Sequence, residues 1–140
     1  MGRLAALESM VQADSTNVEA LVELGHLYLT LQRYGEVAQL SMKALDLDPN
    51  NPEALTHLGM VLMSVEHVAD ALASFDRALD IDPTFGEALQ FKGMVAFMSR
   101  DYATAVEAWE RYVEVVPEDQ QAPRVRAMLG MARASAEEGQ

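Results

Sequence analysis

The pentapeptide LDLDP occupies residues 45–49 and recurs as LDIDP at residues 79–83. A weaker copy, VEVVP, stands at residues 113–117, so the three prolines are spaced 34 residues apart. The same spacing relates two further features, which are the tripeptide EAL at residues 19–21, 53–55 and 87–89 and the glycines Gly25, Gly59 and Gly93. Three independent features share one period, and this period is typical of proteins built from stacked helical or strand units.

Within each period the apolar residues predict two amphipathic helices. In the first unit one helix face is formed by Leu21, Leu24, Tyr28 and Leu31, and after a break at residues 32–33 a second face is formed by Tyr34, Val37, Ala38 and Leu45. Asp48 ends the second helix, because the residue before a proline is pushed out of the helical region. Glycine inside a helix costs ~1 kcal/mol relative to alanine. We therefore expect the paired helix to approach closely at Gly25, Gly59 and Gly93, where a side chain would collide.

A known 34-residue pattern fits much of this unit. The run LGHLY at residues 24–28 matches its first half, and Ala71, Phe75 and Pro83 match its second half. The departures from the pattern are Val37, Ser41, Lys92 and Tyr112. On these residues the chain resembles the tetratricopeptide repeat family. The resemblance implies an all-α fold, a right-handed α-solenoid of three tetratricopeptide helix pairs with an N-terminal half-repeat helix and a C-terminal capping helix.

We expect one domain over residues 1–140. Its parts are an N-terminal helix at 3–13, repeat 1 at 18–51, repeat 2 at 52–85, repeat 3 at 86–119 and a capping helix at 120–138. The N-terminal helix aligns with the second helix of a repeat whose first helix is missing, which suggests a domain excised from a longer protein. Terminal caps keep such stacks soluble, so deleting residues 120–140 is expected to promote aggregation.

The resemblance also implies a peptide-binding groove, because in this family the first helix of each pair lines the concave surface. The predicted groove residues are Glu19, Val22, His26, Leu29, Glu53, Thr56, His57, Met60, Met63, Glu87, Gln90, Met94, Phe97 and Met98. Methionine is flexible and polarizable, so this composition favours an apolar or amphipathic segment, with the three glutamates attracting basic residues. The alternative is that several methionines pack in the core or under the C-terminal helix.

A well-known mode of the family uses cationic side chains to clamp the C-terminal carboxylate of a chaperone. The clamp positions correspond here to Val22, His26, His57, Glu87 and Phe91, none of which is Lys, Arg or Asn. We therefore do not expect a carboxylate-clamp cochaperone.

Charge and composition argue against several other functions. The net charge of −12 opposes binding to nucleic acid and direct binding to anionic membranes, since both need clustered Lys and Arg. The chain has no cysteine, and its serines and glycines lie in no catalytic or phosphate-binding motif. We expect no enzyme, no cofactor and no metal. The sequence does not identify the compartment, which is expected to be cytoplasmic, or periplasmic if the chain was excised from an anchored or exported protein.

Three histidines carry the remaining chemical interest. His26 and His57 fall on the first helices of adjacent repeats and are predicted to face each other on the concave side, whereas His67 is predicted to be exposed between two helices. Two histidines could bind a metal, but no third ligand is identifiable from the sequence. We interpret them as hydrogen-bonding residues of the groove.

Function is predicted to be non-enzymatic binding of a protein or peptide ligand, as an interaction module or scaffold. Features at both ends of the chain, including LAALE at residues 4–8 and WER at residues 109–111, also resemble the repeat domain of bacterial cytochrome c maturation proteins, which hold apocytochrome segments. A secretion chaperone is the other alternative.

A homo-oligomer is further predicted, formed through the open repeat ends or through the C-terminal helix, whose Arg124–Arg133 segment could dock in an acidic groove.

Overall fold

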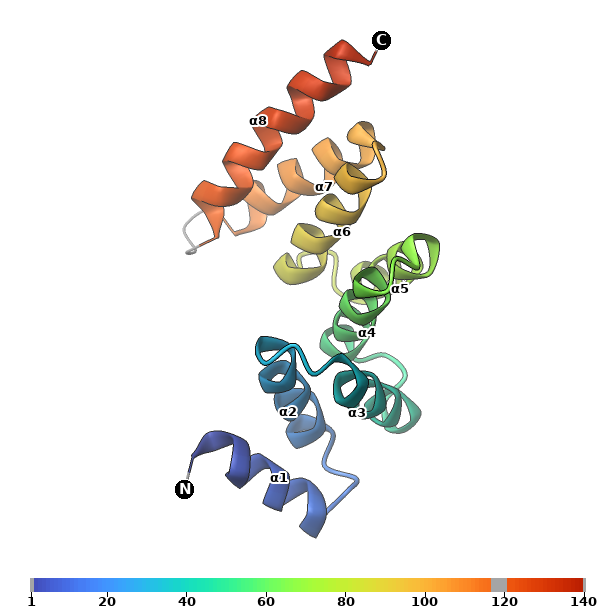
Figure 1. Cartoon of the computed structure of the whole chain (residues 1–140), viewed down its shortest axis with the longest axis vertical. Coiled ribbons are helices and arrows are strands. Elements are labelled where there is room, and N and C mark those ends of the chain that lie inside the picture. Colours follow the sequence, from blue (N-terminus) through green and yellow to red (C-terminus); the bar gives the residue numbers. More distant parts are fainter. Residues whose placement is uncertain (1, 117–120, 140) are drawn as a thin grey trace.

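The computed structural model describes residues 2–116 and 121–139, and within these the chain forms eight α-helices and no strand. The helices are α1 (Arg3–Ala13), α2 (Val18–Thr30), α3 (Tyr34–Leu47), α4 (Pro52–Ser64), α5 (Val68–Ile81), α6 (Gly86–Met98), α7 (Tyr102–Val115) and α8 (Ala122–Glu138). Each helix packs on the next, and α2, α4 and α6 also contact one another in turn. The helices ascend the long axis of the molecule from one terminus to the other (Figure 1). This confirms the all-α solenoid.

In the first two repeats the first helix begins at a side chain that caps a free amide group. The side-chain Oδ1 of Asn17 accepts a hydrogen bond from the Ala20 amide at 3.1 Å, and Oδ1 of Asn51 accepts one from the Ala54 amide at 2.9 Å. Pro52 opens α4, at a position where the missing amide hydrogen costs nothing. In the third repeat Phe85 stands at the capping position without a side-chain hydrogen bond. Asparagine caps therefore fix the start of α2 and α4 but not of α6.

The same helices end in a turn that places a non-glycine residue in the left-handed region. Gln32, Glu66 and Arg100 have φ angles of 57°, 64° and 64°. The amide of the residue that follows each of them reaches back to a carbonyl of the last helical turn, as from Arg33 to Tyr28 at 2.9 Å. This is the Schellman arrangement, which usually employs glycine.

Close helix contact explains two of the three periodic glycines. A Cβ on Gly93 would lie 2.1 Å from Trp109 Nε1, and one on Gly59 would lie 2.5 Å from the Phe75 ring. At Gly25 the expectation of a close approach is wrong, since the nearest atom would be 3.5 Å away. The reason is that Ser41 stands 34 residues before Phe75, where the second and third repeats carry an aromatic ring.

The core is a series of apolar clusters along the stack. The cluster at the C-terminal end joins α6, α7 and α8 through buried Trp109, Tyr112, Val125 and Leu129. Tyr112, a departure from the repeat pattern, is thus a core residue beneath the last helix. Lys92, another departure, forms an ion pair with Asp76 at 2.7 Å.

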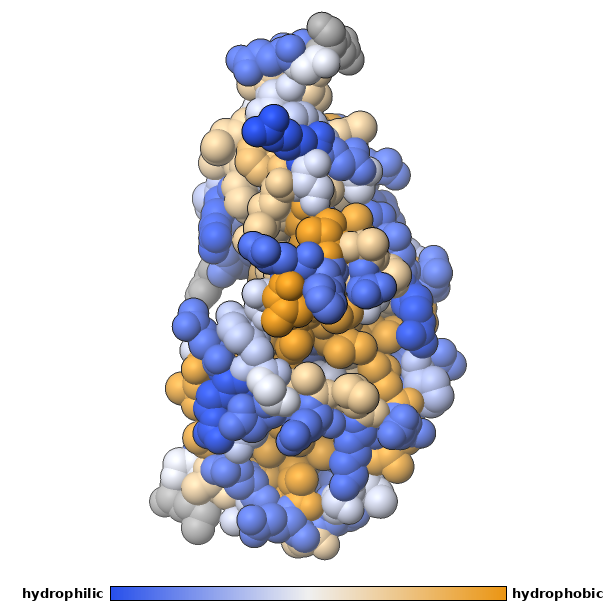
Figure 2. Space-filling model, turned by 45° about the vertical axis from the view of Figure 1, so that its right-hand side comes forward, coloured by the Kyte–Doolittle hydropathy of each residue, from blue (hydrophilic) through white to orange (hydrophobic). Residues whose placement is uncertain are grey.

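No helix in the part of the chain that the structure describes is both long and apolar enough to cross a membrane. On the face shown in Figure 2, hydrophobic patches are interspersed with hydrophilic residues.

Candidate functional site

Residues of α2, α4 and α6 line a groove made of two adjoining open hollows. The N-terminal hollow has a volume of about 900 Å³ and is lined by residues that include Val22, Glu53 and Phe85. The central hollow, of about 870 Å³, extends from Leu29 past Met60 to the start of α8. His26, Glu53, Phe85 and Glu87 belong to both hollows. The two hollows together are called the groove below.

The structure divides the predicted groove residues among four environments. The groove is lined by Glu19, Val22, His26, Leu29, Glu53, Met60, Glu87 and Gln90. Met63 lines a smaller adjoining hollow with Met98. Met94, Phe97 and Met98 line a separate pocket against α8. Thr56 and His57 are buried, with 0% and 1% exposure, because their side chains point into the stack. The Thr56 hydroxyl donates to the Pro52 carbonyl at 2.7 Å.

The separate pocket is called the methionine pocket below. Because of it, the methionines predicted for the groove do not form one continuous surface. Its volume is about 190 Å³, and its lining is Met94, Phe97, Met98, Trp109, Met128 and Met131. Met94 packs against the C-terminal core cluster, whereas Met98 and Met131 are exposed. Packing under the C-terminal helix, the alternative considered from the sequence, therefore holds for Met94.

The groove is acidic. Five carboxylates contribute to its lining, namely Glu19, Glu23, Glu53, Asp82 and Glu87. Arg124, from the first turn of α8, lines the far end of the central hollow. The C-terminal helix also bears Arg133, whose guanidinium lies 3.8 Å from the Glu110 carboxylate on α7. Arg124 thus reaches the groove of its own chain, whereas Arg133 forms an ion pair outside the groove.

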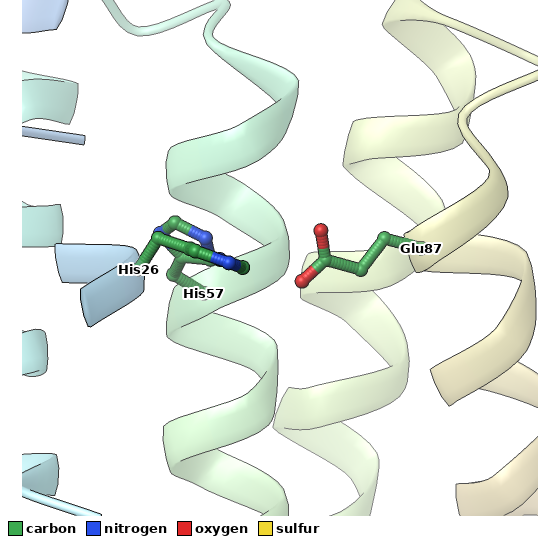
Figure 3. A group of neighbouring side chains, drawn as sticks. All are labelled: His26, His57 and Glu87. Carbon is green, nitrogen blue, oxygen red and sulfur yellow. The ribbon is translucent and has the colours of Figure 1, made fainter. Parts of the chain in front are cut away.

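Three side chains from successive repeats converge where the two hollows meet. The His26 ring on α2 and the His57 ring on α4 have centroids 5.8 Å apart and an interplanar angle of 32°. The Glu87 carboxylate on α6 points toward both rings (Figure 3). One potential ligand atom of each residue lies within 4.8 Å of the other two. These residues are called the His–His–Glu cluster below.

Burial sets the electrostatics of this cluster. Burial lowers the pKa of His57 to about 4, with a further contribution from the nearby His26 ring. The imidazole is therefore neutral at neutral pH. Burial also raises the pKa of Glu87, an effect that His26 opposes and Glu53 reinforces. His57 Nδ1 is buried without a hydrogen-bond partner among the described residues. This nitrogen faces Gly25, since a Cβ there would meet it at 3.5 Å.

The sequence located the two histidines but did not connect Glu87 to them. Residues at the same repeat position are 34 apart, whereas His26 and His57 are 31 apart and His57 and Glu87 are 30 apart. Each separation is one repeat less about one helical turn of 3.6 residues. The cluster therefore runs diagonally across α2, α4 and α6. A search at spacings of one repeat minus three or four residues would have found it.

Comparisons with known proteins identify the repeat. The family model described as tetratricopeptide repeat matches residues 18–51 and 52–85. One similar structure is the crystal structure of MamA, with 23% sequence identity and a TM-score of 0.79. The match covers 96% of this chain and 77% of the MamA chain. The first tetratricopeptide repeat domain of human RPAP3 is 24% identical in sequence, with a TM-score of 0.75. The match covers 88% of this chain and 97% of the RPAP3 domain. The TPR2B domain of yeast Sti1 is 18% identical, with 84% and 96% coverage and a TM-score of 0.74. No curated protein matches the chain.

Proposed function

Since the chain belongs to the tetratricopeptide repeat family, whose domains mediate protein–protein interactions, we propose that its groove binds a segment of another protein. The observation that carries the proposal is the lining of the groove. Apolar side chains such as Val22, Leu29 and Met60 line it together with carboxylates. A basic amphipathic segment complements this surface, because its apolar face displaces water while its cations meet the glutamates.

The same lining distinguishes this chain from similar structures that hold acidic peptides. One of them, the first repeat domain of RPAP3, is 24% identical with a TM-score of 0.75 and was solved with the HSP90 peptide SRMEEVD. In this chain Glu53 and Glu87 lie in the groove, and they would repel the acidic residues of such a peptide. We therefore infer a ligand of the opposite charge.

Partner capture from cells of the source organism tests the groove. The informative variant is Met60→Gln, which removes an apolar contact from the central hollow and adds no charge. Its matched control is Met42→Gln, because Met42 is 57% exposed on α3 and lines neither hollow. Wild type and Met42→Gln should retain the partner and Met60→Gln should lose most of it. Equal capture by all three would place the site elsewhere.

Charge is tested with the purified partner segment, or with a synthetic basic amphipathic peptide in its place. Glu53→Gln should weaken binding severalfold at low salt and have less effect at high salt, since screening shortens the reach of the glutamate. Labelled SRMEEVD should show no saturable binding in the same fluorescence-anisotropy assay. Tight binding of SRMEEVD would contradict the inferred ligand charge.

Two narrower functions remain proposals within this one. A cytochrome c biogenesis factor would hold apocytochrome segments, and a secretion chaperone would protect an apolar segment. Both need the groove and differ only in the ligand, so the captured partner separates them. Tetratricopeptide repeats are typically non-catalytic, and we infer that this chain is not an enzyme. Hydrolase or transferase activity abolished by replacing His26 would overturn that inference.

A further inference from the structure

The His–His–Glu cluster has the donor set of a transition-metal site. Imidazole nitrogen suits zinc, copper, iron and nickel, whereas sites for magnesium and calcium consist of oxygen donors. Two histidines and one glutamate are also a known ligand set for zinc, in which a fourth position stays open. In this protein the three donors come from α2, α4 and α6.

The geometry needs little adjustment to accept an ion. Because the three ligand atoms lie within 4.8 Å of one another, some point lies within about 2.8 Å of all three. Zinc–ligand distances are about 2.0–2.2 Å, so each ligand atom would have to move inward by somewhat less than 1 Å. His57 is held by burial on α4, whereas His26 is exposed and free to adjust.

The charge of the cluster also favours a cation. None of the ion pairs among the described residues involves Glu87. Its electrostatic neighbours are His26 and the like-charged Glu53. The carboxylate is thus half-buried without a Lys or Arg partner in the described part of the chain, which is a costly arrangement that a divalent cation relieves. The exposed ring of His26 leaves the remaining coordination position facing the groove.

We propose that His26, His57 and Glu87 bind one zinc-class divalent cation that links three successive repeats. The open position would take a water molecule or a donor side chain of a bound segment. This departs from the expectation of no metal drawn from the sequence, and it does not depend on the groove binding a peptide, since the test below uses the metal alone.

Isothermal titration calorimetry of tag-free, chelator-treated protein with Zn²⁺ tests the proposal. One ion should bind each chain, and Mg²⁺ in excess should not compete. Replacing a residue that merely orients a metal ligand costs about 10–100-fold in affinity. Removing a ligand outright should therefore cost at least about 100-fold, in His26→Gln and Glu87→Gln alike. Zinc should also raise the thermal midpoint of the wild type and of neither variant.

The controls separate this site from adventitious binding. His67→Gln removes an exposed histidine outside the cluster, and Glu19→Gln removes an exposed groove carboxylate. Both should bind zinc as the wild type does. The proposal is overturned if the wild type binds no zinc, or if the control variants lose as much affinity as His26→Gln and Glu87→Gln. Far-ultraviolet circular dichroism checks that every variant is folded, and His26→Gln is expected to fold as the wild type does because His26 is exposed.

Discussion

The contact between Gly93 and Trp109 is the tightest that the helix pairs make at a glycine. Trp109 is 1% exposed, and its Nε1 donates a hydrogen bond to the backbone carbonyl of Gln90 at 3.1 Å. Because the ring is buried and its N–H is hydrogen-bonded, moving it away from a methyl group at residue 93 would disturb that hydrogen bond and the packing of the cluster. Gly25 offers the opposite case, with ordinary van der Waals space at the same repeat position.

We expect Gly93→Ala to destabilise the fold by about 2–3 kcal/mol, since overpacking outweighs the better helix propensity of alanine. Gly25→Ala is the matched control and should be neutral or stabilising by up to about 1 kcal/mol. Chemical denaturation followed by circular dichroism measures both. Equal losses in the two variants would show that the close approach at Gly93 is unimportant.

The pair of glycines also shows what the repeat pattern can and cannot predict. The 34-residue period correctly predicted an inward-facing glycine in each first helix. It could not predict the space around it, which depends on the residue opposite. Where Phe75 and Trp109 fill that space, Ser41 leaves it open, and its buried hydroxyl has no hydrogen-bond partner among the described residues.

Asp14 gives the short connection before α2 a pH-sensitive contact. Its carboxylate accepts hydrogen bonds from the Thr16 hydroxyl at 2.6 Å and the Thr16 amide at 2.9 Å, and these bonds lower its pKa. A carboxyl group whose pKa is lower in the folded than in the unfolded state stabilises the fold at pH values above its unfolded pKa, here 3.8. This stabilisation is lost as the pH falls through the folded pKa. Asp14→Asn should therefore cost stability at pH 7 and less at pH 3. Urea unfolding at both pH values checks this, and a cost independent of pH would contradict it.

At the scale of the element, the ends of α2, α4 and α6 store conformational strain. An L-residue in the left-handed region costs roughly 1–2 kcal/mol, whereas glycine adopts it freely but loses more entropy on folding. Gln32→Gly, at a φ of 57°, should therefore stabilise the fold by about 0.5–1 kcal/mol. Gln32→Val should destabilise it, because a β-branched residue fits this region poorly. The two denaturation midpoints should move in opposite directions, and a shared direction would disprove the assigned strain.

The last helix, α8, is held to the stack by buried apolar side chains, among them Leu129. Leu129 is 5% exposed and packs in the cluster with Trp109 and Tyr112. Leu129→Ala should cost about 2–4 kcal/mol. Met131→Ala, on the same helix at 59% exposure, should stay within about 0.5 kcal/mol of the wild type. Comparable losses would mean that the helix is anchored by its outer face.

Deletion of residues 120–140 is expected to cause aggregation for a related reason. The deletion would expose the apolar cluster around Trp109 and Tyr112 to solvent.

At the scale of the whole molecule, the sequence predicted the fold better than the site. Helix positions follow from the local spacing of apolar residues, so α1 was predicted over the residues that form it, 3–13. The site depends on how one repeat is displaced relative to the next, which no single repeat encodes. The packing of α2, α4 and α6 brings Glu87 to the two histidines, and His57 is buried in the stack instead of lying on the groove surface on which it was predicted.

The chain contains one tryptophan, and its indole is buried where α6, α7 and α8 meet. Tryptophan fluorescence will therefore report on the C-terminal end of the molecule alone, whereas circular dichroism averages over all the helices. In a linear array each repeat contacts only its neighbours, so the two ends need not unfold together. The difference between the two optical transitions would thus measure how far cooperativity extends along the array, without any introduced label.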